Sequence, residues 1–157
     1  SGVELSEAEI AAGLSAVSWP ARLQPITSGP LFEMLPAGAT LFLDGGHNPH
    51  AAEMLARHFA GQKIYLITGM MENRNPADFL APLAGVVERM AAVPIPGEAA
   101  HAPSSLVAAA RGLAIPATAF DSPRHALQQV GEGETVLIAG SLYLAGQVLR
   151  VSGLAPE

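Results

Sequence analysis

The apolar positions of the chain form short runs that alternate with longer segments of helical periodicity. Short apolar runs are typical of buried strands, and they cover residues 39–44, 63–70, 86–95, 115–120 and 134–140. Apolar residues at helical spacing predict helices over residues 49–61, 75–85, 102–112, 121–130 and 141–153. Regular alternation of strand and helix is the signature of βαβ units. We therefore predict an α/β fold, a doubly wound and mostly parallel sheet with helices on both faces.

The N-terminal part of the chain carries a different pattern. Ser6 and Glu9 form a capping box, which predicts a short helix over residues 7–17. Two short extended segments are then expected, at residues 21–26 and 31–35, and residues 27–30 form the turn between them.

Composition and charge exclude several classes of protein. Half of the 157 residues are hydrophobic and 14% are charged, which excludes a disordered chain. A formal net charge of -6 argues against binding to nucleic acid or to a membrane surface, since both need an excess of Lys and Arg. Without cysteine the chain forms neither disulfides nor thiolate zinc sites. It has no apolar segment of bilayer length and no signal-peptide pattern, so we expect a soluble cytoplasmic protein.

The clearest candidate site is the turn in "LFLDGGHNPH", where an apolar run stops at Asp44. Ligands of open α/β sheets bind beyond the carboxyl ends of the strands, and Asp44 falls at such an end. Asn48 suits a helix N-cap, and Pro49 suits the first helical position. The free N–H groups of that helix start favour a carboxylate or a phosphate. His47, in the turn, can donate a hydrogen bond to an anion or accept one from a ribose hydroxyl.

A simpler interpretation competes at these positions. Asp44 can cap its own turn, and His47 can be an ordinary loop histidine. No third ligand accompanies His47 and His50 at a metal-binding spacing, so we predict no metal site. The chain also lacks a P-loop, a dinucleotide-binding glycine motif and a nucleophile elbow around Ser141. The residues therefore indicate contact with a nucleotide or an acid, and nothing in them indicates a reaction run by this domain alone.

Four stretches resemble the C-terminal domain of folylpolyglutamate synthase and dihydrofolate synthase, within the Mur-ligase superfamily. "DGGHNPHAA" resembles the family's D-G-A-H-N-P-x-A motif and is the most specific of the four. The others follow in the family's order and are "WPARLQ", "LITGMMENRNPADFLAPL" and "VLIAGSLYLAGQVLR". Together the four stretches span residues 19–150.

The resemblance implies an ATP-dependent ligase that adds L-glutamate to dihydropteroate or to (tetrahydro)folate through an acyl-phosphate intermediate. It implies ATP with magnesium as cofactor and a pteroate or folate acceptor, and we expect a monomer. The family's P-loop, magnesium ligands and carbamylated lysine belong to an N-terminal domain, so we expect that domain in cis. We accordingly divide this chain into a leading helix, residues 1–18, and a glutamate-binding domain, residues 19–157. Ser1-Gly2 is compatible with a scar of tag removal.

The resemblance also implies roles for particular residues, of which Arg22 and His47 are the candidate catalytic ones. Arg22 would reach the ATP phosphates, and Asp44 would accept hydrogen bonds from the ribose. His47 would lie close to the nucleotide and the incoming glutamate. Ser141 would hold a glutamate carboxylate, and Tyr143 would line the same junction. The competing interpretations are a surface ion pair for Arg22, N-capping for Ser141 and a core position for Tyr143.

Three positions depart from the family's pattern. Ala21 stands where glycine is usual, and Gly46 stands where alanine is usual, a change that a flexible turn should accept. "NRN" at residues 73–75 replaces a Lys-Asp pair, so no role is carried over to it. We interpret Arg74 as a solvated loop charge and His101 as a surface residue without a convergent partner.

Two other functions stay open at this stage. One is a peptidoglycan-precursor ligase of the same superfamily, which the two residues before His47 disfavour. The other is a stand-alone α/β binding or regulatory module that senses a small acid.

Overall fold

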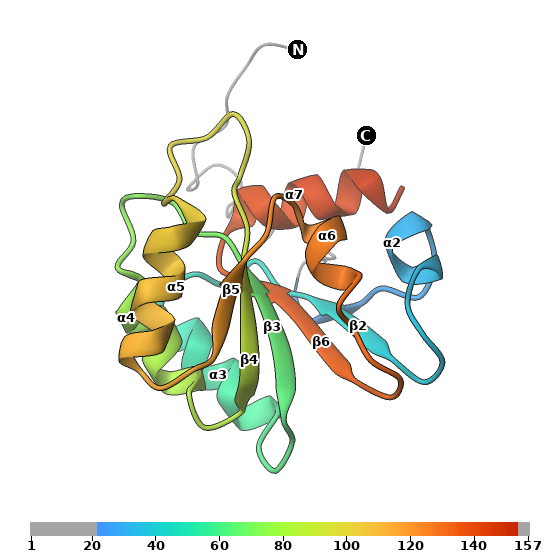
Figure 1. The fold of residues 1–157 in the computed structure, drawn as a ribbon, viewed down its shortest axis with the longest axis horizontal. Coiled ribbons are helices and arrows are strands. Elements are labelled where there is room, and N and C mark those ends of the chain that lie inside the picture. Colours follow the sequence, from blue (N-terminus) through green and yellow to red (C-terminus); the bar gives the residue numbers. More distant parts are fainter. Residues whose placement is uncertain (1–21, 154–157) are drawn as a thin grey trace.

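The structure of the chain is a computed structural model that describes residues 22–153. The predicted helix over residues 7–17 and its capping box lie outside this range. The strands are β1 (Gln24–Pro25), β2 (Thr40–Leu43), β3 (Ile64–Thr68), β4 (Val87–Ala92), β5 (Ala117–Ala119) and β6 (Thr135–Ala139). The helices are α2 (Pro30–Glu33), α3 (Pro49–His58), α4 (Pro76–Leu80), the 3-10 helix η1 (Ala81–Leu83), α5 (Pro103–Gly112), α6 (Pro123–Leu127) and α7 (Leu142–Val151) (Figure 1).

The described strands form one sheet in the order β1-β2-β6-β3-β4-β5. Every neighbouring pair is parallel except β1 and β2, which are antiparallel. The prediction of a mostly parallel sheet is therefore confirmed. The last strand along the chain, β6, lies between β2 and β3, an order that the hydrophobic pattern does not determine.

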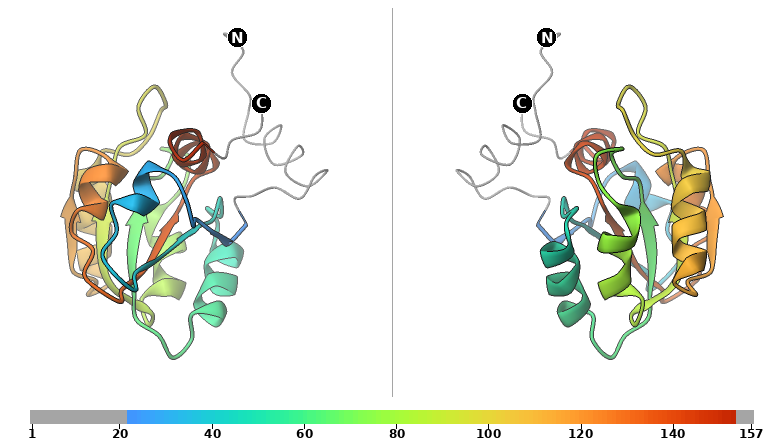
Figure 2. Two further views of the ribbon diagram at one scale, coloured as in Figure 1. Left: turned by 90° about the vertical axis from the view of Figure 1, so that its right-hand side faces the viewer. Right: turned by 90° about the vertical axis from the view of Figure 1, so that its left-hand side faces the viewer.

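Successive residues of the central strands point to opposite faces of the sheet, as the strand period requires. On β3, Leu66 packs with the residues of α3, α4 and α5, and Ile67 packs with those of α2, α6 and α7. On β6, Leu137 and Ile138 repeat the alternation. The right-hand view of Figure 2 shows α3, α4 and α5 together on one side of the sheet. Helices thus cover both faces, as predicted for a doubly wound fold.

The predicted N-cap of α3 is confirmed, because the Asn48 side chain accepts a hydrogen bond from Ala51 N at 2.8 Å. Asn75 caps α4 and Ser122 caps α6 in the same way, whereas α5 begins without a side-chain cap. Within the described part of the chain, every helix falls short of the length and apolar character that a membrane crossing requires.

One predicted element is wrong, because residues 31–35, expected to be extended, contain the end of the short helix α2. Pro30 opens this helix after Gly29, whose φ of 90° reverses the chain direction. Leu31 is 2% exposed and packs with the α7 face of the core, so tertiary burial holds the helix in place. A Cβ on Gly29 would lie 2.7 Å from the carbonyl oxygen of Ser152, so glycine also permits the close approach of α2 to the end of α7.

Candidate ligand site at the carboxyl end of the sheet

The carboxyl ends of β2 and β6 form a topological switch point. The chain leaves β2 for α3 on one face of the sheet, and it leaves β6 for α7 on the opposite face. The two departing loops are joined by backbone hydrogen bonds, 2.9 Å from Asp44 N to Ile138 O and 2.9 Å from Gly140 N to Gly46 O. A junction of loops that diverge to opposite faces is the usual ligand site of an open α/β sheet, and we call this junction the crevice.

Asp44 holds two backbone segments together at this crevice. Its carboxylate accepts hydrogen bonds from Gly46 N at 2.7 Å and from Leu23 N at 2.9 Å. Burial raises the pKa of Asp44, while those two hydrogen bonds and the charge of Arg22 oppose the rise. Each carboxylate oxygen keeps a lone pair, so the same group that fixes the turn can still accept a hydrogen bond from a ligand.

The glycine before His47 is closely packed. A Cβ on Gly46 would lie 2.7 Å from the Cβ of Ala51 and 2.8 Å from Oδ1 of Asp44. In this chain an alanine at position 46 would therefore need the helix start or the carboxylate to shift. His47 itself is half-buried in the turn, directly before the Asn48 cap. The turn thus brings Asp44, His47 and the start of α3 to one place, as the sequence predicts.

Ser141 lies on the other side of the crevice, at the start of α7. It is 1% exposed, and its Oγ accepts hydrogen bonds from Tyr143 N at 3.0 Å and Leu144 N at 3.4 Å. Gly140 precedes it with a φ of 119°, which turns the chain out of β6. Ser141 is therefore an N-cap, and its hydroxyl proton is still available for a further acceptor. Tyr143 is half-buried and packs against the core of the α7 face.

Arg22 is the first described residue and is exposed. Its charge opposes the burial-driven rise in the pKa of Asp44, and Arg22 directly precedes Leu23, whose N–H binds that carboxylate. The preceding residues of the "WPARLQ" stretch, Trp19 and Pro20 among them, lie outside the described range. The structure therefore brings Arg22, Asp44 and His47 together on the β2 side, with Ser141 and Tyr143 on the β6 side.

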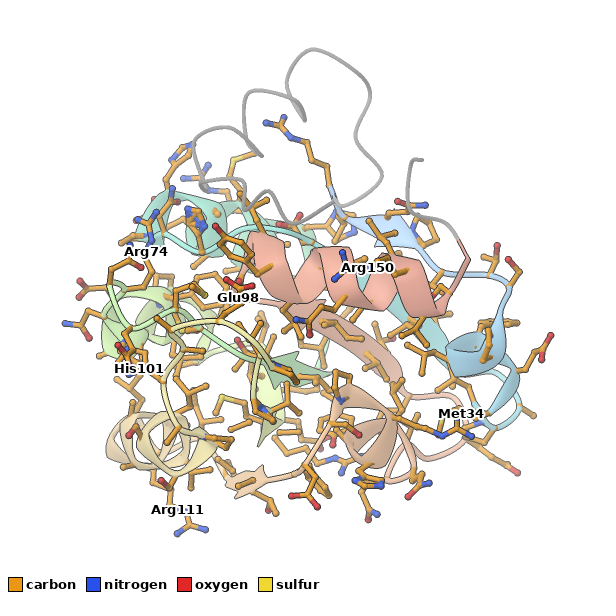
Figure 3. The ribbon with its side chains drawn as sticks, turned by 90° about the horizontal axis from the view of Figure 1, so that it is seen from above. Met34, Arg74, Glu98, His101, Arg111 and Arg150 are labelled. Carbon is orange, nitrogen blue, oxygen red and sulfur yellow. The ribbon has the colours of Figure 1, made fainter. Side chains whose placement is uncertain are left out.

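Two expectations about neighbouring loops are wrong. Arg74 is half-buried with a buried Nε atom, so it is not a solvated loop charge. His101 is also half-buried, and its Nε2–H donates a hydrogen bond to the Arg74 carbonyl at 2.8 Å. The loops after β3 and β4 are thereby tied together, with a further bond of 2.9 Å from Glu72 N to Ala99 O. Figure 3 looks onto this end of the sheet and shows Arg74 and His101 to one side of α7.

Thr68 is the polar residue that sequence reasoning missed. It ends β3, it is 0% exposed, and its Oγ1 has no hydrogen-bond partner in the described structure. The available signal was an apolar run, "IYLIT", that stops at a hydroxyl before Gly69, just as "LFLD" stops at Asp44.

A hollow of about 620 Å³ lies further along the sheet and is lined by residues of β3, β4 and β5, by Arg111 of α5, and by Phe120 and Gln129 on either side of α6. Arg89 crosses it, bound to both carboxylate oxygens of Glu134 at 2.7 and 3.2 Å and stacked 3.8 Å above the Tyr65 ring. The Tyr65 hydroxyl donates to Ala126 O at 2.9 Å, and burial raises the pKa of Tyr65 to about 12. These groups satisfy one another, so the hollow carries structural interactions, and the switch point stays the candidate ligand site.

The chain is a doubly wound α/β domain, and two helices, α3 and α7, start at its candidate ligand site at the carboxyl end of the sheet. The family described as "Mur ligase, glutamate ligase domain" matches residues 32–142, well over half of the chain, and the chain belongs to that family.

Individual relatives extend the match over nearly the whole chain. The dihydrofolate synthase/folylpolyglutamate synthase of Escherichia coli (strain K12) is 28% identical over 160 residues, which cover 96% of this chain and 35% of that protein. The crystal structure of folylpolyglutamate synthase from Thermotoga maritima is similar at a TM-score of 0.72 and 28% identity, over 97% of this chain and 35% of that one.

A further solved structure contains ligands. A bifunctional folylpolyglutamate synthase/dihydrofolate synthase with Mn, AMPPNP and L-glutamate bound is similar at a TM-score of 0.67 and 25% identity, over 95% of this chain and 35% of that one. The chain thus spans about a third of the length of the relatives it matches.

Proposed function

We propose that this chain is the glutamate-binding domain of an ATP-dependent amide ligase that adds L-glutamate to dihydropteroate or to (tetrahydro)folate. The observation that carries the proposal is the crevice between β2 and β6, where Asp44, His47 and Ser141 meet two helix starts. Membership of the glutamate ligase family and the similarity to a synthase with a nucleotide analogue and L-glutamate bound support it.

The proposed reaction has two steps. A carboxylate oxygen of the pteroate or folate acceptor attacks the γ-phosphorus of ATP, the bond to the β-phosphate oxygen breaks, and ADP leaves. The amine of L-glutamate then attacks the carbon of the resulting acyl phosphate, loses a proton, and inorganic phosphate leaves. Both steps move negative charge between oxygens, so fixed hydrogen-bond donors and cations around the ligands stabilise their transition states.

The β2 side of the crevice is proposed to meet the nucleotide. Asp44 accepts hydrogen bonds from ribose hydroxyls through the lone pairs that Gly46 and Leu23 leave over. Arg22, exposed and on the same side, contacts the phosphates through its planar set of donors. The start of α3 adds a partial positive charge nearby.

Glutamate is proposed to bind between His47 and the start of α7. The Ser141 hydroxyl, whose oxygen already accepts two backbone N–H groups, donates its proton to a glutamate carboxylate. His47 lies between this position and the nucleotide, where its imidazole donates a hydrogen bond to an anionic oxygen. Tyr143 lines the same junction with the exposed part of its ring.

Magnesium is not proposed to bind to this domain alone. Over residues 22–153 no group of three or more His, Asp or Glu side chains could hold a metal ion. The described residues therefore do not fit a magnesium site, and we assign no step to a metal held by them. On this proposal the P-loop, the magnesium ligands and the acceptor site belong to an N-terminal domain of the full-length protein.

The test is phosphate release from ATP by the full-length gene product that contains this domain. We expect release that depends on both L-glutamate and dihydropteroate or tetrahydrofolate. His47→Ala should reduce the rate about 100-fold or more, the usual effect of removing a group that contacts the reacting charges. His50→Ala is the matched control, because His50 is an exposed histidine in the first turn of α3, three residues after His47.

The outcomes separate the parts of the proposal. Equal rates for both variants would retain the ligase and remove His47 from its site. No release with either acceptor, but release with a nucleotide-linked muramyl substrate, would replace the folate acceptor by a peptidoglycan precursor.

A further inference from the structure

Thr68 is a fully buried hydroxyl with an unused hydrogen-bonding capacity. It is 0% exposed, and no donor or acceptor of the described structure reaches its Oγ1. Leaving a hydroxyl buried and unpaired is unfavourable, whereas valine has the same shape without that cost. Packing alone would therefore favour valine at position 68, and the presence of a hydroxyl there needs another explanation.

The hydroxyl faces the turn that carries Ser141. Thr68 pairs in register with Ala139, the last residue of β6. A Cβ built on Gly140 would collide with Thr68 Oγ1 and would lie 2.9 Å from the Gly69 carbonyl oxygen. The Thr68 hydroxyl is therefore directed at the backbone of Gly140, immediately before the start of α7.

The position continues the proposed site across a third strand. Gly140 N donates to Gly46 O at 2.9 Å, so Gly46, Gly140 and Thr68 follow one another across the ends of β2, β6 and β3. Asp44 and Ser141 flank the first two positions of this row. Among these three residues, Thr68 alone has a polar side chain, and its Oγ1 has no hydrogen-bond partner in the described structure.

We propose that Thr68 is a specificity-determining residue that donates a hydrogen bond to a carboxylate of the amino-acid substrate, an inference that rests on the proposed function. The carboxylate lies near Gly140, between the hydroxyls of Thr68 and Ser141, at the positively polarised start of α7. These donors match the several lone pairs of a carboxylate.

Access to the hydroxyl requires a side-chain movement of Met70. The Met70 Cγ lies 3.3 Å from the same Cβ position at Gly140, so this side chain is beside the hydroxyl and is buried. Methionine is unbranched and flexible, so it can change rotamer without a shift of the backbone. Its backbone is fixed, because Met70 O accepts a hydrogen bond from His101 N at 2.8 Å.

The test compares Thr68→Val and Thr68→Ser in the full-length protein by steady-state phosphate release. Thr68→Val should raise the KM for L-glutamate about tenfold or more, the effect of losing one hydrogen bond to a charged group. The KM for ATP should stay within about twofold, since the row of donors at β3 is on the far side of β6 from Asp44. Thr68→Ser keeps the hydroxyl and should keep a glutamate KM close to that of the wild type.

Thermal unfolding of the same proteins separates binding from folding. Thr68→Val removes a buried unpaired hydroxyl, so its Tm should equal or exceed that of the wild type. Thr118→Val, at an exposed threonine of β5, is the matched control and should change neither KM. An unchanged glutamate KM in Thr68→Val would overturn the inference, as would a lower Tm with both KM values raised together. No glutamate-dependent release by the wild type is a different result, because it would remove the proposed function itself.

Discussion

At the scale of single residues, the Asp44 carboxylate both fixes the backbone of the crevice and keeps acceptor capacity for a ligand. Asp44 closes its own turn through Gly46 N and also holds Leu23 N from a segment 21 residues earlier. Leu23 has a φ of 46°, so the chain adopts a left-handed conformation where its N–H meets the carboxylate. The two interpretations of Asp44 that the sequence left open are therefore compatible, because a capping carboxylate retains acceptor capacity for a ligand.

The pH dependence of stability should report the environment of Asp44. Burial raises the pKa of Asp44 above its ordinary value of 3.8, so the folded chain holds a proton that the unfolded chain releases. This contribution is fully present below pH 3.8 and is lost as the pH rises through the folded pKa. The quantity to follow is the unfolding free energy of the wild type minus that of Asp44→Asn. We expect this difference to fall as the pH rises from 3.8 through the folded pKa and to level off near neutrality.

Urea unfolding at a series of pH values measures that difference. Asp78→Asn, at an exposed aspartate of α4, gives the baseline for loss of one carboxylate. A difference that grows with rising pH would mean that the hydrogen bonds from Gly46 and Leu23 outweigh burial.

Gly140 should be intolerant of any side chain. Its φ of 119° and the contact of a Cβ with the Gly69 carbonyl oxygen at 2.9 Å predict that Gly140→Ala loses about 2–5 kcal/mol of unfolding free energy. Gly146→Ala is the contrasting control, because Gly146 lies inside α7 with nothing within 4 Å of a Cβ. It should gain about 0.5–1 kcal/mol through helix propensity. Equal effects of the two substitutions in urea unfolding would contradict this account.

Residue types at strand ends predicted much of the site but not all of it. Asp44, His47 and Asn48 were visible because charged and capping residues interrupt an apolar run. Thr68 was hidden, because threonine is also a favoured strand residue and its hydroxyl becomes notable only when burial and partners are known. The hydrogen bond from His101 to the Arg74 carbonyl joins residues 27 positions apart, a pairing that no local pattern contains.

At the scale of elements, the two helices that start at the crevice are fixed by their caps. Ser141→Ala removes an oxygen that accepts from Tyr143 N and Leu144 N, so we expect a loss of about 1 kcal/mol of unfolding free energy. Ser122→Ala, which removes the cap of α6 through His125 N, should cost a similar amount. Only Ser141→Ala should also raise the glutamate KM of the full-length enzyme. If both variants lose stability and neither changes that KM, Ser141 is a cap alone.

Helices and strands followed from the pattern wherever an element was long enough to show its period. The strands β2 to β6 and the helices α3 to α7 all lie within their predicted segments. The exception, α2, has four residues, too few for a helical period to appear, and it is stabilised by the burial of Leu31 against the α7 face. Short elements of this kind are set by tertiary contacts, which the sequence pattern does not contain.

At the scale of the whole molecule, the order of the strands creates the site. A prediction of βαβ units gives parallel strands but leaves the place of β6 open. Because β6 inserts between β2 and β3, the start of α7 comes to lie beside the Asp44 turn, almost 100 residues earlier in the chain. The ends of β2, β6 and β3 are therefore neighbours, while the sequence has no phosphate-binding loop of its own.

This division of the site predicts weak nucleotide binding by the chain on its own. Arg22, Asp44 and one helix start offer few contacts to a triphosphate, and a net charge of -6 opposes the approach of an anion. We expect a dissociation constant for magnesium-ATP above about 1 mM, which corresponds to little more than 4 kcal/mol of binding free energy. NMR titration of the isolated chain with magnesium-ATP measures the dissociation constant and also identifies the residues that the nucleotide contacts. Amide shifts should change around Asp44 and Ser141 and stay constant around Arg89, which lines the hollow of about 620 Å³. Tight, saturable binding in the micromolar range would instead mean that this chain carries a complete site and acts as a stand-alone binding module.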